Sequence, residues 1–262
     1  MTLPVRPGAG RPAARPAGPD PLTPLLDLPG VREAAESART GIDRLLAHRL
    51  MRNRSAEVSS ESALRGARAS AALDGVDVAL ADLRAGSVED PVVQGSLRVS
   101  VGLGAMVDTW AVAPGQVLAR LHVLAAADLA DRGDLGRPAP HAGPRLGGLF
   151  QVVTGTSTVP AVLVAGLVHG ELAALAPFGA ADGVVARAAG RLTVIGRGLD
   201  PKAVSVPEVG FLELGPDAYA QALAGYASGT EAGVAGWLVH CCRATELGAR
   251  EGLAIAEAIL RG

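Results

Sequence analysis

Apolar residues recur along this chain at the spacing of α-helices rather than of β-strands. Between residues 31 and 51, for example, the apolar side chains gather near one face of a helix, with arginine and glutamate elsewhere. The strict alternation that marks a half-buried strand is scarce, and only residues 205–214 form a weak strand candidate. No segment repeats with a fixed period. The pattern therefore predicts an all-α fold.

Capping residues, glycines and prolines set the ends of the predicted helices. Ser55 or Ser59 is placed to cap a helix that stops before Gly75. Pro91 lies in a first turn, where its missing N–H costs little. We expect helices over residues 31–51, 55–73, 79–84, 91–110, 114–131, 159–175, 183–197, 216–226 and 230–260, with a short segment at 146–153.

The same pattern divides the chain into three parts. Residues 1–25 are dense in proline, which removes backbone donors and blocks helices, so we expect a disordered lead there. Residues 26–110 form a set of N-terminal helices, and residues 111–262 form the core.

Composition and charge restrict the classes of function. Apolar residues make up 49% of the chain and aromatic residues only 3%, which favours close packing of helices through small side chains. The net charge of −2 and the lack of a run of basic residues argue against nucleic-acid binding. The longest apolar run, residues 159–168, is too short to span a membrane, and the lead does not look like a signal peptide. We expect a cytoplasmic protein that binds neither nucleic acid nor membrane.

Two further sites are disfavoured by the residue pattern. Cys241 and Cys242 are adjacent, so their side chains diverge on a helix, and their spacing is not that of a zinc site. A dinucleotide-binding fold is also disfavoured, because no glycine-rich loop follows a predicted strand.

The most informative stretch is the loop that joins two predicted helices at residues 176–183. Asp182 precedes an apolar helical run, so its carboxylate is placed to cap the amides of residues 184 and 185. Alternatively, those amides and Arg187, one turn into the helix, would hold an anion such as a phosphate. The residues alone favour the cap.

This stretch resembles the Fic motif, which reads H-P-F-x-[DE]-G-N-G-R-x-x-R in that family. Pro177, Phe178, Gly183 and Arg187 match the motif. The reactive positions differ, because Ala176 replaces the histidine, Ala180 the acidic residue and Val184 the first arginine, while Ala181 and Asp182 replace the Gly-Asn pair. The motif is therefore degenerate.

Flanking segments resemble the family in the same order, over about residues 31–258. Residues 68–75, with Ser70, Asp74 and Gly75, are similar to its N-terminal inhibitory helix, in which glutamate is usual at the place of Asp74. His169 lies on an apolar helix like the one that precedes the motif, and residues 121–124 resemble an early core helix. Residues 219–223 and 237–238 resemble the closing helices, and residues 137–144 lie where a target-docking flap occurs.

The resemblance implies an all-α Fic/Fido domain. Most active members transfer AMP from ATP to a hydroxyl of a target protein. The motif histidine removes the hydroxyl proton, the acidic residue holds magnesium, and the glycine-rich loop binds the phosphates. The last arginine, here Arg187, meets the phosphates or the inhibitory glutamate. Asp74 is one methylene shorter than glutamate, which argues against that inhibitory contact.

The substitutions argue against unchanged chemistry. Ala176 has no proton acceptor, and loss of a general base costs about 10²–10⁴-fold in rate. Ala180 cannot ligate magnesium, and Val184 removes a cation from the phosphates. We expect a pseudoenzyme that binds a nucleotide or a protein partner, with Gly183 and Arg187 as the nucleotide-binding residues and ATP and magnesium as the implied ligands.

Two alternatives stay open. In one, the chain is an active nucleotidyltransferase with altered residues, in which Asp182 supplies the basic or metal-binding carboxylate. In the other, it is a helical interaction module that binds no nucleotide. His169 and His122 are expected to pack in the core. Arg187 would then meet a phosphate or pair with Asp74 or Asp182, and the oligomeric state is left undetermined.

Overall fold

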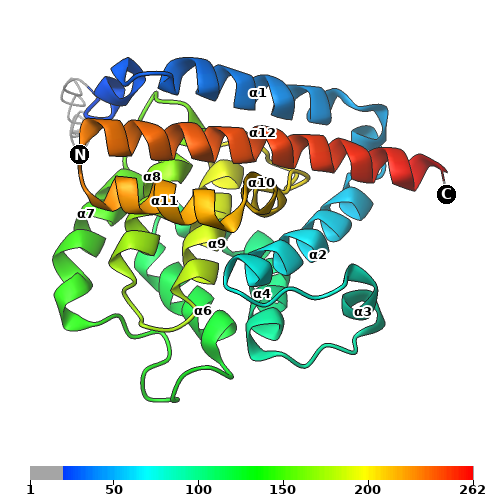
Figure 1. Ribbon diagram of the computed structural model, residues 1–262, viewed down its shortest axis with the longest axis horizontal. Coiled ribbons are helices and arrows are strands. Elements are labelled where there is room, and N and C mark those ends of the chain that lie inside the picture. The colour runs from blue at the N-terminus through cyan, green and yellow to red at the C-terminus, as the bar shows by residue number, and fades with distance from the viewer. Residues whose placement is uncertain (1–19, 262) are drawn as a thin grey trace, which may run out of the picture.

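The computed structural model describes residues 20–261, and every regular element in this range is a helix (Figure 1). The α-helices are α1 (Val31–Ala47), α2 (Ser55–Leu73), α3 (Leu80–Ala85), α4 (Pro91–Gly102), α5 (Val107–Trp110), α6 (Pro114–Ala126), α7 (Gly143–Thr154), α8 (Ala161–Leu175), α9 (Asp182–Gly196), α10 (Pro207–Leu214), α11 (Pro216–Ala227) and α12 (Glu231–Arg261). Short 3₁₀ helices are η1 (Thr23–Asp27), η2 (Arg49–Arg52), η3 (Leu103–Met106) and η4 (Pro140–Ala142). The expected all-α fold is confirmed.

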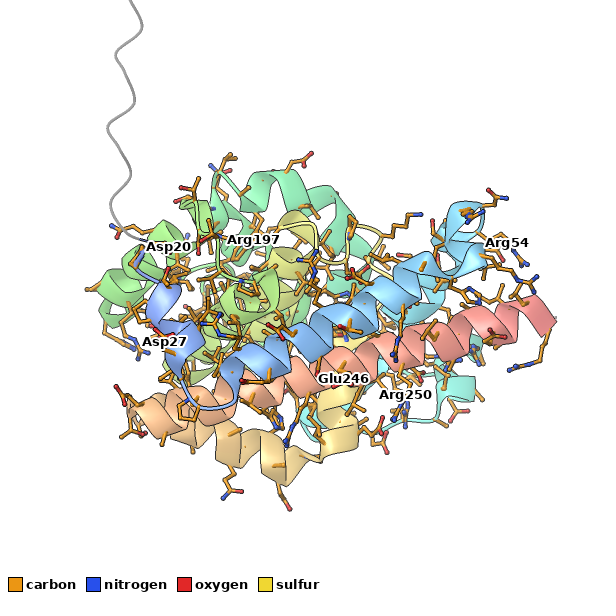
Figure 2. All side chains as sticks on the ribbon, turned by 90° about the horizontal axis from the view of Figure 1, so that it is seen from above. Asp20, Asp27, Arg54, Arg197, Glu246 and Arg250 are labelled. Atoms are coloured by element: carbon orange, nitrogen blue, oxygen red, sulfur yellow. The ribbon has the colours of Figure 1, made fainter. Side chains whose placement is uncertain are left out.

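The expected disordered lead lies mostly outside the described residues, which begin at Asp20. Its last part, residues 20–25, is ordered, so the prediction was wrong there. The Asp20 carboxylate accepts hydrogen bonds from the Ser157 hydroxyl and the Thr158 amide, both at 2.8 Å. Figure 2 shows Asp20 beside Arg197 at this end of the molecule. The start of η1 is therefore tied to the turn that precedes α8.

Helix α12 is the longest element, and it runs along α1 across one side of the molecule (Figures 1 and 2). Helices α10 and α11 pack on α12, and α8 and α9 pack antiparallel behind them. Helix α8 is apolar on nearly all sides, with Glu171 as its one charged residue, as expected for a helix buried between neighbours. The loop between α8 and α9 is therefore supported by rigid, buried helices.

Glycines allow the closest contacts between helices. A Cβ added to Gly95 of α4 would lie 2.1 Å from the carbonyl oxygen of Ala125 on α6, and one on Gly210 of α10 would lie 1.9 Å from that of Ala244 on α12. These backbones approach to a distance that excludes any larger residue. The many small residues of this chain therefore allow its helices to pack with their backbones in contact.

Some helix boundaries differ from the sequence prediction. The helix expected over 91–110 is broken into α4, η3 and α5, and the helix that starts at Pro114 ends at Ala126. The weak strand candidate at 205–214 was wrong, because Pro207 starts α10 there. No helix within residues 20–261 combines the length and the apolarity needed to cross a membrane.

We predict that Gly95→Ala is strongly destabilising. The added methyl group would meet the Ala125 carbonyl, so α4 and α6 must separate, at a cost of about 3 kcal/mol in the free energy of unfolding. Gly147→Ala, at an exposed position of α7, is the matched control, since an added Cβ there meets nothing within 4 Å. It should stabilise the protein by about 0.5–1 kcal/mol. Urea unfolding measures both, and equal effects would contradict this account of the packing.

Candidate functional site

The loop between α8 and α9 reverses the chain through three left-handed residues. Ala176 has φ of 44°, Gly179 of 77° and Ala181 of 54°. Glycine adopts this region freely, whereas an alanine there costs about 1–2 kcal/mol. The surrounding contacts therefore hold this loop in a conformation that two of its residues do not favour.

Asp182 fixes the loop from inside the first turn of α9. Its Oδ1 accepts a hydrogen bond of 3.0 Å from the amide of Phe178. The expected cap on residues 184 and 185 was wrong, because the helix already begins at Asp182 and Ala181 takes the N-cap position. The carboxylate therefore closes the loop on itself.

Neighbouring segments hold the same loop from outside. The Pro177 carbonyl accepts a 2.8 Å hydrogen bond from the Ala139 amide, so residues 137–144 pack against the loop. The Phe178 ring stacks on His122 of α6, with ring centroids 4.2 Å apart and planes 9° from parallel. His122 is fully buried, and its Nδ1 accepts from the Gly136 amide. His122 is a packing residue of the loop.

The side chain of Arg187, in the second turn of α9, extends to the end of α2. Its Nε donates to the Ser70 hydroxyl at 2.9 Å, and one terminal nitrogen donates to the Ser70 carbonyl at 2.9 Å and to Asp74 Oδ1 at 2.7 Å. The Arg187 side chain is 2% exposed and that of Asp74 is 25% exposed. We call this contact of Arg187 with Ser70 and Asp74 the clamp.

Asp74 is held rigidly because it is the C-cap of α2. The Gly75 amide bonds to the Ala72 carbonyl and the Val76 amide to the Ala71 carbonyl, each at 3.0 Å, and Gly75 has φ of 92°. This pattern is the Schellman motif, which needs a left-handed residue after the cap. The helix end itself is therefore aimed at Arg187, so the expectation that Asp74 is too short was wrong.

The Asp74 carboxylate also lies against the first turn of α9. A Cβ added to Gly183 would lie 2.4 Å from Asp74 Oδ1 and 3.1 Å from a terminal nitrogen of Arg187. Helix N-termini stabilise anions through their free amides and their dipole. Asp74 therefore lies where the sequence suggested that a phosphate would bind.

A buried polar chain continues from Arg187 into the core. Burial alone would lower the pKa of Arg187, but the charge of Asp74 and the Tyr219 hydroxyl raise it above its ordinary value. The Tyr219 hydroxyl lies 2.8 Å from His169 Nε2. Burial, the charge of Arg187 and His240 hold the pKa of His169 well below its usual range, so the ring is neutral.

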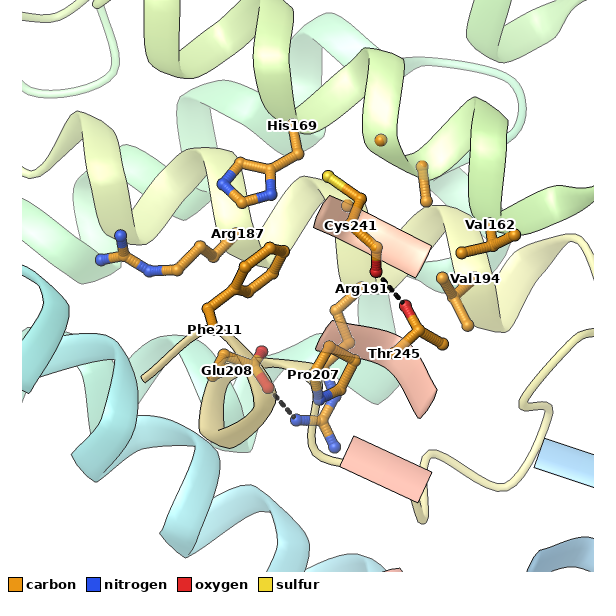
Figure 3. Close-up of a pocket in the computed structure, with 13 residues that line it drawn as sticks. Val162, His169, Arg187, Arg191, Val194, Pro207, Glu208, Phe211, Cys241 and Thr245 are labelled. Atoms are coloured by element: carbon orange, nitrogen blue, oxygen red, sulfur yellow. Dashed lines mark hydrogen bonds and ion pairs between the residues drawn. The ribbon is translucent and has the colours of Figure 1, made fainter. Parts of the chain in front are cut away.

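A small cavity lies on the inner side of Arg187, among α8, α9, α10 and α12 (Figure 3). His169 and Phe211 line it, together with the ion pair of Arg191 and Glu208, whose nitrogen and oxygen are 3.0 Å apart. Its volume of about 30 Å³ is near that of one water molecule in the liquid. Ligand pockets usually measure about 300–1,000 Å³, so this cavity is too small for a nucleotide.

The residues at the motif do not fit a magnesium ion. Ala176 and Ala180 carry no ligand atoms, and the Asp182 carboxylate bonds to loop amides. Within residues 20–261, no three His, Cys, Asp or Glu side chains lie close enough together to form a metal site. Nor is there room for a phosphate at Gly183 while Asp74 lies there.

The structure brings the candidate residues together around one point. Ser70, Asp74, Gly183 and Arg187 meet at the clamp, while Pro177, Phe178 and Asp182 shape the loop beside it. Sequence reasoning missed the Arg191–Glu208 pair and the role of Tyr219. Two arginines four residues apart in an otherwise apolar helix were the available signal, since buried cations need carboxylate partners.

Two solved structures with a similar arrangement of helices are Fic proteins. A Fic family protein from Desulfovibrio desulfuricans G20 superposes with a TM-score of 0.71 at 17% identity, over 86% of this chain and 74% of its own. Fic-1 from C. elegans gives a TM-score of 0.69 at 16% identity, over 90% of this chain and 75% of its own. No protein-family model matches the sequence, and no curated protein matches it significantly. The chain therefore has the Fic fold, as the motif suggested.

We predict that Asp74→Ala costs about 3 kcal/mol in the free energy of unfolding, because it leaves the Arg187 guanidinium buried without its counter-charge. In an Arg187→Met background the same change should cost less, by roughly 1–3 kcal/mol. Asp77→Ala is the matched control, because Asp77 pairs with Arg68 at the surface and should contribute about 0.5 kcal/mol or less. Chemical denaturation of the four variants measures the coupling, and additive losses would contradict the clamp.

We predict a pH dependence that originates at Asp182. Burial raises the pKa of this carboxyl above its ordinary 3.8, against the Phe178 and Gly179 amides that lower it, and the charge of Asp74 raises it further. The folded chain then binds this proton more readily than the unfolded chain, so stability should fall as the pH rises from about 4 through the raised pKa.

Asp182→Asn keeps an acceptor for the Phe178 amide but removes the titration. The difference in free energy of unfolding between this variant and the wild type should therefore change between about pH 4 and 7, to the relative advantage of the variant at the higher pH. Urea unfolding across this range tests the expectation. Parallel curves for the two proteins would exclude Asp182 as the titrating group.

Proposed function

We propose that this chain is a Fic-fold pseudoenzyme whose nucleotide loop is closed by its own inhibitory helix. The observation that carries the proposal is the Asp74 carboxylate, which pairs with Arg187 and lies on Gly183 at the start of α9. In the motif that the loop resembles, these positions bind the phosphates. A carboxylate there competes with a phosphate for the same donors.

The residues around the loop support loss of AMP transfer. A hydroxyl of a target protein would find no base at Ala176, and His169 is neutral but buried and bonded to Tyr219. Ala180 offers no oxygen to a metal ion, and Val184 is a buried aliphatic residue in place of a cation. These losses act on one transition state, so they need not add, but each one lowers the rate.

The function that is left is binding. A nucleotide can reach Arg187 only after Ser70 and Asp74 withdraw, so the clamp reduces the apparent affinity by the fraction of chains in which it is open. With the clamp closed, the role that is left to the chain is to bind a protein partner through its surface. An active enzyme that uses Asp182 as its base or metal ligand is less well supported, because this carboxylate already accepts a hydrogen bond from the Phe178 amide.

Nucleotide titration separates these roles. We expect that ATP and ADP bind the wild type weakly, and that Asp74→Ala tightens binding about tenfold or more by freeing Arg187 and the first turn of α9. Magnesium should not tighten the binding of either nucleotide, because the motif lacks its ligand. Asp77→Ala should bind like the wild type. Calorimetry measures the affinities, with circular dichroism to show that each variant is folded.

Transfer of labelled AMP to protein targets is the second measurement. Neither the wild type nor Asp74→Ala should transfer the label. Transfer that is lost in Arg187→Ala would overturn the proposal, and loss in Asp182→Asn would favour the altered enzyme. If no variant binds nucleotide, the chain is an interaction module instead.

A further inference from the structure

A second concave site adjoins the cavity of Figure 3, and Arg191 of α9 lines both. It is a groove of about 690 Å³ between α2, the end of α4 with η3, the last turns of α9 and residues 201–203. Figure 1 shows α2 crossing beside α4 in this part of the molecule. The volume falls in the range of about 300–1,000 Å³ that is usual for small-molecule sites, and gaps between helices are a common place for them.

Small side chains leave this space open. Six of the lining residues are serine, alanine or glycine, namely Ser59, Ser60, Ala63, Ser100, Gly104 and Ala203. A Cβ added to Gly104 would meet no atom within 4 Å. One wall is held in place by Arg191, a lining residue that is buried and bonded to Glu208 and to the Ala203 and Ser205 carbonyls.

The chemistry of the lining is one-sided. Aliphatic side chains form the walls, namely Leu64, Leu97, Val101, Leu103, Val107 and Ile195. Val101 at the rim is 84% exposed. Lys202 supplies an ammonium group, and the other lining cation, Arg191, is already paired with Glu208. The lining contains serine hydroxyls but no aspartate or glutamate, although the whole chain has a net charge of −2. Lys202 donates to the Met51 carbonyl, which leaves two of its three N–H donors for another acceptor.

We propose that this groove binds an amphipathic monoanion, with a carboxylate-type head at Lys202 and an unbranched aliphatic chain along the leucine, valine and isoleucine walls. The charge of the lining selects an anion over a cation, and the six aliphatic side chains of the walls favour an aliphatic chain over a compact anion. The site involves no atom of the clamp. Its occupancy is therefore a separate question from nucleotide binding at the loop.

The test is a calorimetric titration of the full chain with hexanoate, octanoate and decanoate, each below its aggregation concentration. We expect one saturable site, with affinity rising about fourfold for each added methylene, the change that corresponds to about 0.8 kcal/mol per buried CH₂. Acetate and decyltrimethylammonium should not bind, and decanol should bind more weakly than decanoate.

Variants locate the site. Lys202→Gln should weaken decanoate binding at least threefold, Lys202→Arg should retain it, and Ser100→Phe should block it by filling the groove. Arg120→Gln, which removes a charge from an exposed position of α6 outside the groove, should leave it unchanged. Melting curves show that each variant is folded. Absence of saturable binding, equal binding of decanoate and decyltrimethylammonium, or full binding by both Lys202→Gln and Ser100→Phe would overturn the proposal.

Discussion

The structure depends on one buried guanidinium and on what surrounds it. A charged group taken out of water is costly unless a counter-charge and hydrogen bonds replace its hydration. For Arg187 these come from Ser70 and Asp74 at the end of α2, with Tyr219 on the other side. The contacts that satisfy this residue tie the end of α2 to the first turns of α9, in addition to the packing of α2 on α4, α10 and α12.

The Asp74 carboxylate lies between the ends of two helix dipoles of opposite sign. As the C-cap of α2 it lies at the negative end of one helix dipole, which is unfavourable for a carboxylate. It also lies against Gly183 at the positive end of α9, and it pairs with Arg187. The same geometry makes the start of α9 unavailable to another anion as long as α2 stays docked.

Local signals in the sequence predicted most of the fold. The end of α2 at Leu73 follows from Asp74-Gly75, and the starts of α4 and α6 follow from their prolines. Residues 205–214 were misassigned because the propensity of Val206, Val209 and Phe211 favours strands, whereas Pro207 and the packing of α10 on α12 decide for a helix. The strand propensity of individual residues does not take such tertiary contacts into account, so it cannot predict this helix.

The site was predictable as a set of residues but not as a set of contacts. Motif spacing brought Ser70, Asp74 and Arg187 into consideration, but their distances depend on how a Schellman motif aims the end of α2. For Asp182 a small error in a helix boundary was enough to change the expected contact. The helix begins one residue earlier than expected, so Asp182 bonds to the Phe178 amide instead of capping the helix. Asp74 and Arg187 are 113 residues apart in the chain, and Asp74 is the first of the two to be synthesised. During translation Asp74 is therefore made first and can stay hydrated until Arg187 follows. Arg187 is never buried before the carboxylate that balances its charge has been made.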